Sequence, residues 1–334
     1  MKPNSKSEIR NPKQIQNSKH PTLAPRRNPF GILDFGHSCL FRISNFESRI
    51  SILGALTLGI LLVGGCATQP PTPPLEICPG QPTVEAALQT LTARARNAVP
   101  VWANGRAVLT YHAPDQKKPE RHSLDIVFRL DPPARLYLQG GPTGAPKAVI
   151  LGSNEEEFWL ALKPKDISSF YLGRWQEVRD FEGLVMSPRI VLEAIGIVNV
   201  PGSVLNPALW KLENKGPYDI LTQRDQSGRP ARRLHVYACD YSVRQIEYFD
   251  PRGKVVAVAQ LDGYQPVVEG FQVPTQINVV STRPEGRKDS VVMELSSVRT
   301  KAFNERQRQG LFNPPETDRF EHIYHYIDGQ WVEE

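Results

Sequence analysis

The chain has 334 residues, of which 40 are Lys or Arg and 35 are Asp or Glu, so its formal net charge is +5 at pH 7. This excess lies in the first 65 residues, which hold nine basic and three acidic side chains; from Cys66 onward, 31 basic side chains stand against 32 acidic ones. Nucleic-acid binding depends on a basic surface, so the near-neutral body of the chain argues against that class of function.

The segment Arg49–Cys66 has the layout of an export signal. One Arg precedes fourteen largely apolar residues, and Gly64-Gly65 leads into a cysteine. The apolar run is shorter than the ~20 residues that span a bilayer. The ending V-G-G-C resembles the lipobox of bacterial lipoproteins, which implies lipidation of Cys66 and removal of residues 1–65. Ala67 after that cysteine implies the outer membrane; the alternatives are an ordinary secretory signal or a buried apolar helix.

Residues 66–82 are predicted to form a tether, because six prolines in the sixteen positions after Cys66 favour extended polyproline conformation. Cys78 lies in this tether, and Cys239 is the only other cysteine after Cys66. An exported protein meets an oxidising compartment, so these two residues either form a disulfide or remain as two thiols.

The body of the chain begins with a helix and continues with strands. Apolar residues at helical spacing from Thr83 predict an amphipathic helix that ends before Pro100. A second helix is expected over residues 188–198, with Ser187 as its cap and Pro188 at its first position. Period-two alternation between turn motifs predicts strands over 102–112, 122–130, 134–139, 147–151, 157–162, 169–175, 218–224, 232–238, 243–249, 254–261, 272–280 and 290–299. Their even spacing indicates one antiparallel sheet, curled or closed.

This order of elements, together with W-A-N-G-R-A at residues 102–107, P-P-A-R-L-Y-L at 132–138 and Y-F-D-P-R-G-K at 248–254, resembles the LolA/LolB lipoprotein-carrier family. The resemblance covers roughly residues 83–312. It implies a mainly β, α+β fold: a curled, antiparallel, incomplete β-barrel with a helical lid and an apolar interior that holds acyl chains. Residues 313–334 are expected to be a polar C-terminal tail.

If the interior holds acyl chains, its lining should come from the apolar positions of the strands. The candidates are Leu124, Ile126, Phe128, Leu136, Leu138, Phe158, Leu160 and Leu162. Burial of each CH₂ contributes about 0.8 kcal/mol, which lets such a cavity compete with a membrane. The alternative for each candidate is an ordinary place in a packed core.

Common catalytic motifs are absent from the sequence. It has no G-x-S-x-G elbow, no H-E-x-x-H pair and no Walker loop. The run Glu155-Glu156-Glu157 is expected in a solvated turn, G-G-P-T-G at residues 140–144 in a hairpin turn, and His322 and His325 in a surface tail rather than at a metal. The predicted function is therefore non-enzymatic, without cofactor or metal: an outer-membrane lipoprotein that binds lipid or lipoprotein acyl chains. The alternative is a structural or sensory envelope protein with a packed barrel that meets a periplasmic protein partner.

Overall fold

A computed structural model describes residues 76–112, 118–142, 147–163, 168–177, 188–194, 206–283, 286–328 and 330–334 of the chain. The predicted signal, Cys66 and most of the predicted tether lie outside these residues.

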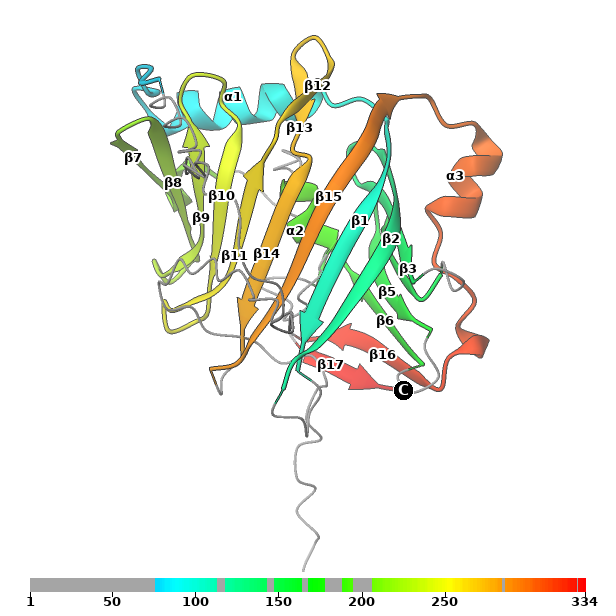
Figure 1. Ribbon diagram of the computed structural model, residues 1–334. Coiled ribbons are helices and arrows are strands. Elements are labelled where there is room, and N and C mark those ends of the chain that lie inside the picture. The colour runs from blue at the N-terminus through cyan, green and yellow to red at the C-terminus, as the bar shows by residue number, and fades with distance from the viewer. Residues whose placement is uncertain are drawn as a thin grey trace, which may run out of the picture.

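A single curled sheet of fifteen strands forms the body of the molecule (Figure 1). Its strand order is β17-β16-β6-β5-β4-β3-β2-β1-β15-β14-β11-β10-β9-β8-β7. Described neighbours pair antiparallel except β16 and β6, which are parallel. The sheet is not closed into a barrel, because β7 and β17 stand at its two ends. The mainly β, curled and incomplete barrel predicted from the sequence is thus confirmed.

The first half of the sheet follows the predicted strands closely. Its strands are β1 (Val101–Tyr111), β2 (Glu120–Asp131), β3 (Arg135–Gly141), β4 (Val149–Ser153), β5 (Glu157–Leu162) and β6 (Ser169–Arg174). The second half consists of β7 (Trp210–Lys215), β8 (Tyr218–Arg224), β9 (Pro230–Tyr237), β10 (Val243–Phe249), β11 (Val255–Asp262), β14 (Gln276–Thr282) and β15 (Lys288–Thr300). A separate hairpin joins β12 (Gln265–Val268) to β13 (Phe271–Val273). Strand β7 was not predicted from the sequence, and the single strand predicted over residues 272–280 is divided between β13 of this hairpin and β14.

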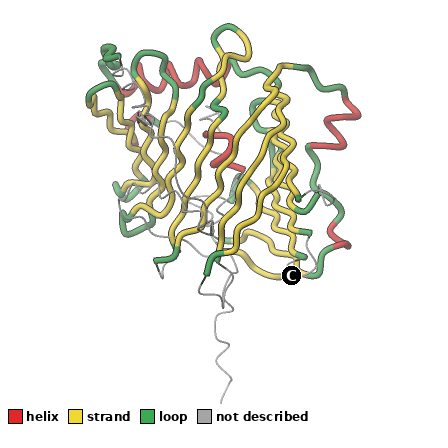
Figure 2. The backbone as a smooth tube through the Cα atoms, viewed as in Figure 1, coloured by secondary structure: helices red, strands yellow, loops and turns green. Residues whose placement is uncertain are grey.

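Among the described residues, the α-helices α1, α2 and α3 accompany the sheet (Figure 2). Helix α1 (Val84–Arg96) begins where predicted, because the Thr83 hydroxyl accepts a hydrogen bond from the Ala86 amide. Helix α2 is described over Pro188–Ala194, the first part of the predicted second helix. Helix α3 (Glu305–Leu311) was not predicted; it begins with a capping box between Asn304 and Gln307.

Alternation along the strands divides the buried side chains between two faces of the sheet. On β2, Leu124, Ile126, Phe128 and Leu130 are at most 7% exposed and belong to the larger apolar cluster, which fills the concave side. Helix α1 contributes Ala87, Leu88 and Leu91 to the same cluster. Successive strand residues point to opposite faces, so this pattern makes the concave side the main core.

The outer face of the first half carries a second apolar cluster. Tyr137, Ile150, Trp159 and Phe170 of the sheet pack there with Phe303 and Phe312, which flank α3. The C-terminal segment crosses this outer face and then adds β16 (His322–Ile327) and β17 (Gln330–Glu333) beside β6. The expected polar tail is therefore wrong for residues 322–333, because their alternating aromatic residues pair with the sheet.

Candidate functional site

The eight predicted lining residues lie together on the concave face, on β2, β3 and β5. Strand register places Phe128 opposite Leu138, Leu138 opposite Leu151, and Leu151 opposite Leu160. Leu136 and Phe158 share a second row through Ser153, and Ile126 and Leu162 share a third through Gly140 and Val149. The result is a continuous apolar wall. Its eight predicted members, none more than 7% exposed, are Leu124, Ile126, Phe128, Leu136, Leu138, Phe158, Leu160 and Leu162.

Helix α2 lies inside the curl of the sheet, against this wall on one side and the second half of the sheet on the other (Figure 1). It contacts both β4 and β11. Its Ile190, Val191 and Leu192 are at most 1% exposed and join the larger apolar cluster. The helix therefore covers the apolar wall from within the concavity.

A polar row crosses the concave face opposite the apolar wall. Trp210 of β7 pairs in register with Gln223 of β8, Gln223 with Arg232 of β9, and Arg232 with Tyr248 of β10. Arg232 Nε donates a 2.6 Å hydrogen bond to Gln223 Oε1, and its guanidinium carbon lies 5.2 Å from the centre of the Trp210 ring. Other buried polar residues on the inward-facing side of the sheet are Asp219 of β8 and Asp289 of β15, which pairs with Arg283.

Glu193 of α2 meets the polar row. Arg232 Nη1 donates to Glu193 Oε1, and the Tyr248 hydroxyl donates to Glu193 Oε2 at 2.7 Å. Arg189, one turn earlier on α2, has its Nε 3.5 Å from Glu193 Oε1. Burial and the neighbouring Glu193 carboxylate raise the pKa of the Tyr248 phenol well above its ordinary value. Tyr248 therefore stays protonated and acts as a hydrogen-bond donor.

Arg232 and Glu193 were not predicted as site residues, although each is a charged residue at a position where the sequence pattern expects an apolar one. Arg232 begins the alternation that continues with Leu234 and Val236, so it occupies a position that points inward. Glu193 follows three apolar residues of α2 that are buried. A charge at a core position of a predicted strand or helix is a local signal, because buried charges are rare unless paired.

Cys78 and Cys239 form a disulfide across 161 residues. It joins the end of the tether to the turn that follows β9, and the Tyr237 hydroxyl of the same region donates to the Glu76 carbonyl. Among the described residues, Glu76, Cys78 and Cys239 also make up a group with metal-ligand atoms close together, but the disulfide occupies both sulfur atoms. The structure thus pairs the two cysteines and leaves no thiolate there to bind a metal.

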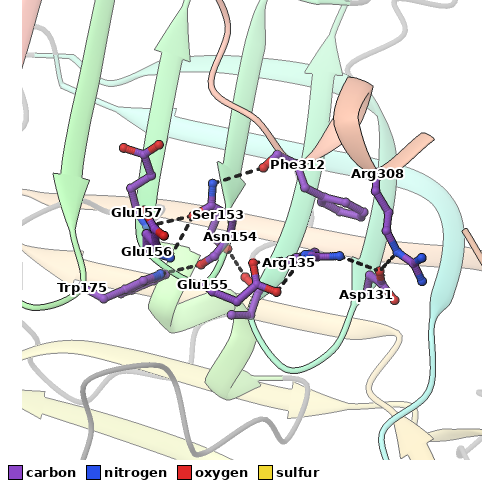
Figure 3. A network of polar contacts seen from close by, with 11 residues as sticks. Asp131, Arg135, Ser153, Asn154, Glu155, Glu156, Glu157, Trp175, Arg308 and Phe312 are labelled. Carbon is purple, nitrogen blue, oxygen red and sulfur yellow. Dashed lines mark hydrogen bonds and ion pairs between the residues drawn. The ribbon is translucent and has the colours of Figure 1, made fainter. Parts of the chain in front are cut away.

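In the acidic run, Glu155 and Glu156 lie in the turn between β4 and β5, and Glu157 begins β5 (Figure 3). Asn154 Oδ1 accepts from the amides of Glu156 and Glu157, both at 2.9 Å, and Glu155 pairs with Arg135 at 2.8 Å. This turn is held by hydrogen bonds from backbone amides to the Asn154 side chain and by the ion pair of Glu155 with Arg135. Of G-G-P-T-G, Gly140 and Gly141 belong to β3 and Pro142 follows them, whereas residues 143 and 144 lie outside the described residues.

The two histidines of the C-terminal segment lie on strand β16, not on a helix. His322 Nδ1 is 2.8 Å from Glu333, and His325 Nε2 is 3.3 Å from Glu334. Residues three apart on a strand point to opposite faces. The two rings therefore do not converge on one ion.

Two grooves on the outer face are lined by described residues. One, of about 430 Å³, lies on the edge strands β7–β9 and includes Lys211, Lys215, Arg224 and Arg233. The other, of about 420 Å³, crosses β1, β2 and β15 near Arg106 and Glu294. Both are open to solvent and include charged side chains, unlike the concave wall. Within the described part of the chain, no helix combines the length and the apolarity needed to cross a membrane.

Comparison with known proteins gave structural likeness only. No family model matches the chain, and no curated protein matches it. A solved structure described as a putative outer membrane lipoprotein-sorting protein domain from Vibrio parahaemolyticus is similar over 68% of this chain and 95% of its own, with 12% identity and a TM-score of 0.46.

Two further solved structures are similar to this chain. A DUF1329 family protein from Desulfovibrio piger covers 67% of this chain and 96% of its own, with 12% identity and a TM-score of 0.45. A LolA superfamily protein from Nitrosomonas europaea covers 66% and 96%, with 11% identity and a TM-score of 0.41. The family named in this last description is the one that the sequence resembles.

Proposed function

We propose that this chain is a non-enzymatic lipoprotein of the cell envelope that binds acyl chains of lipids or lipoproteins against the concave face of its sheet. The observation that carries the proposal is the continuous apolar wall formed by the rows of β2 to β5. The open sheet gives a chain access to this wall without disrupting backbone pairing, and α2 is the element that would have to move aside.

The apolar area explains why an acyl chain would bind there. Each buried CH₂ contributes about 0.8 kcal/mol, so a chain that replaces α2 on the wall recovers much of what it loses on leaving a membrane. The wall contains one polar side chain in its rows, Ser153, and its hydroxyl is already bonded to the Ala134 carbonyl at 2.6 Å. An acyl chain on these rows would therefore not contact a polar side chain that lacks a hydrogen-bond partner.

The proposed location is the periplasmic face of the outer membrane, with Cys66 as the lipid anchor. Two features support export: the signal-like segment Arg49–Cys66, and the Cys78–Cys239 disulfide, a bond typical of oxidising compartments. The proline-rich tether would hold the sheet away from the membrane surface.

Photo-crosslinking tests the acyl-binding proposal on the full chain in envelope membranes. A C16 alkyl probe with a photoactivatable diazirine is added, and peptide mass spectrometry locates the label. We expect label on peptides from β2, β3 and β5. A label confined to the membrane-proximal tether or to the outer face, in a protein with an intact disulfide, would refute the proposal.

Variants of the wall sharpen this test. Leu160→Asp should reduce labelling of the wall at least tenfold, because a carboxylate in an apolar site is costly. Leu160→Trp keeps the site apolar but fills space on the wall, so it should also reduce labelling. It tests the wall separately in case Leu160→Asp does not fold. Val292→Asp, on the outer face where Val292 is 40% exposed, is the control and should leave labelling unchanged.

A second candidate function is an envelope protein with a packed barrel that meets a protein partner. The near-complete burial of the wall beneath α2 favours it, since a filled interior has no room for a ligand. Folded protein that acquires no label on the concave strands, and that co-purifies with a defined envelope protein after chemical crosslinking, would support this candidate.

A further inference from the structure

The polar row and Glu193 form a buried charged cluster that lies against the large apolar cluster of the interior. We propose that Arg232 and Trp210 form a site for the anionic head group, a carboxylate or phosphate, of a single-chain amphiphile, and that this head group takes the place of Glu193 on Arg232. The inference rests on the proposed function and adds to it the chemical class of the ligand.

The cluster contains a buried cation that depends on an anionic partner. Arg232 is 5% exposed, and Glu193, the carboxylate on its Nη1, is 1% exposed. Burying an uncompensated charge is expensive, so an anion must stay on Arg232. A carboxylate or phosphate head group can supply that charge in place of Glu193.

Two buried donors of the cluster have no hydrogen-bond partner in the structure. They are Arg232 Nη2 and Trp210 Nε1, and Trp210 is 6% exposed. The guanidinium lies over the indole ring, so both donors belong to one small region. Two N–H donors beside a guanidinium suit the oxygens of a carboxylate or phosphate, whereas an alcohol oxygen would gain much less from them.

The position of the site next to the apolar wall favours an amphiphile over a free anion. Helix α2, which carries Glu193, contacts β4 of the apolar wall and β11 of the half of the sheet that includes the polar row. A molecule that replaced α2 would therefore have its chain on the wall and its charged end near Arg232.

The exchange leaves Glu193 with partners. When a head group takes its place on Arg232, Glu193 still has the Tyr248 hydroxyl at 2.7 Å and Arg189 at 3.5 Å on its own helix. Displacement therefore need not strand a bare carboxylate in the interior. The head group and Glu193 compete for Arg232, which couples ligand binding to the position of α2.

Two matched probes test the inference on the full chain. One is the diazirine C16 fatty acid, charged at pH 7; the other is the corresponding C16 alcohol, which is neutral. We expect the acid to label the concave strands with at least tenfold higher apparent affinity than the alcohol, the factor that charge-assisted hydrogen bonds supply. Butyrate at millimolar concentration should not compete, because it lacks the chain.

Variants of the cluster separate a binding role from a structural one. Arg232→Met should reduce the affinity for the acid to that for the alcohol and leave the alcohol unchanged. Glu193→Gln removes the competing charge at constant shape and should increase affinity for the acid about tenfold, an outcome that misfolding cannot produce. Arg233→Met is the control, because Arg233 lies on the other face of β9 and pairs with Glu247.

The outcomes distinguish the two proposals. If neither probe labels the concave strands, the acyl-binding function itself is refuted. If both label them equally and Glu193→Gln changes neither affinity, acyl binding stands and the head-group site is refuted. Competition by butyrate would also overturn the inference, since it would show a site for small anions rather than for an amphiphile.

Discussion

Arg308 of α3 donates a 2.8 Å hydrogen bond from Nε to Oδ2 of Asp131 at the end of β2, although 177 residues separate the two in the chain (Figure 3). The contact continues through Arg135, which pairs with both Asp131 and Glu155. The hydrogen bond to Asp131 raises the pKa of Arg308. These polar contacts lie beside the outer aromatic cluster and fix where the C-terminal segment crosses the sheet.

Phe312 is the apolar part of the same attachment. Its ring is 2% exposed and packs edge-on against Phe303 at a centroid distance of 5.2 Å. Phe312→Ala should lower the free energy of unfolding by about 3–5 kcal/mol, the usual cost of removing a buried phenyl group. Urea denaturation of the full chain measures this. Val292→Ala, at an exposed site, is the control and should change it by no more than ~0.5 kcal/mol.

The disulfide between Cys78 and Cys239 should contribute about 2–4 kcal/mol of stability, because it restricts a long loop of the unfolded chain. Urea denaturation with and without reducing agent measures the loss. The double variant Cys78→Ser, Cys239→Ser should match the reduced wild type and should not respond to the reducing agent. Unchanged stability after complete reduction, verified by thiol titration, would contradict the prediction.

Gly173 and Gly310 should respond in opposite ways to the same substitution. A Cβ at Gly173 would lie 2.4 Å from the ring of Phe158, so Gly173→Ala should destabilise the protein by about 1–3 kcal/mol. A Cβ at Gly310, inside α3, would meet nothing within 4 Å, so Gly310→Ala should stabilise it by about 0.5–1 kcal/mol. Thermal unfolding compares the two; a loss at Gly310 equal to that at Gly173 would refute the steric explanation.

Asp225 should make stability depend on acid pH. Hydrogen bonds from the Ser227 side chain and from Arg229 lower the pKa of its carboxyl to about 2. Because the folded-state pKa lies below the unfolded one of about 3.8, the stabilisation is complete above pH 4 and is lost as the pH falls toward 2.

The variant Asp225→Asn isolates this contribution. The difference in unfolding free energy between wild type and variant should be constant near neutral pH and shrink between about pH 4 and pH 2. NMR of the carboxyl carbon should show the pKa of Asp225 rising in Ser227→Ala. A difference that stays the same down to pH 2 would contradict the assignment.

Local patterns predicted the elements whose signals are local. Thr83 and the apolar stripe after it located α1, and the alternation from Leu124 to Leu130 located β2 and its buried face. Strand β7 was missed because W-K-L-E-N-K stands at the edge of the sheet, where only Trp210 is buried. Strand β16 was missed because its partner, β6, is parallel and more than 140 residues earlier.

The candidate site was predicted in part for the same reason. The apolar wall repeats every second residue and can be read from each strand alone. The polar cluster depends on Glu193 and Arg232, which are 39 residues apart and on different elements, so no sequence pattern joins them. Even Arg232 at an inward position does not reveal its partner, because which groups meet inside the curl depends on how far the sheet bends.

Strand β6 pairs in parallel with β16, which is made much later in the chain, so part of the sheet can form only late in synthesis. Synthesis delivers β6 early, yet its outer edge keeps unpaired backbone groups until residues 322–327 are made. The aromatic outer face likewise stays uncovered until α3 packs on it. A chain that ended near Thr300 would therefore expose both the unpaired edge of β6 and the aromatic rings of the outer cluster. Strand β16 thus covers the outer edge of β6, and a chain that lacks it would be prone to aggregation or proteolysis.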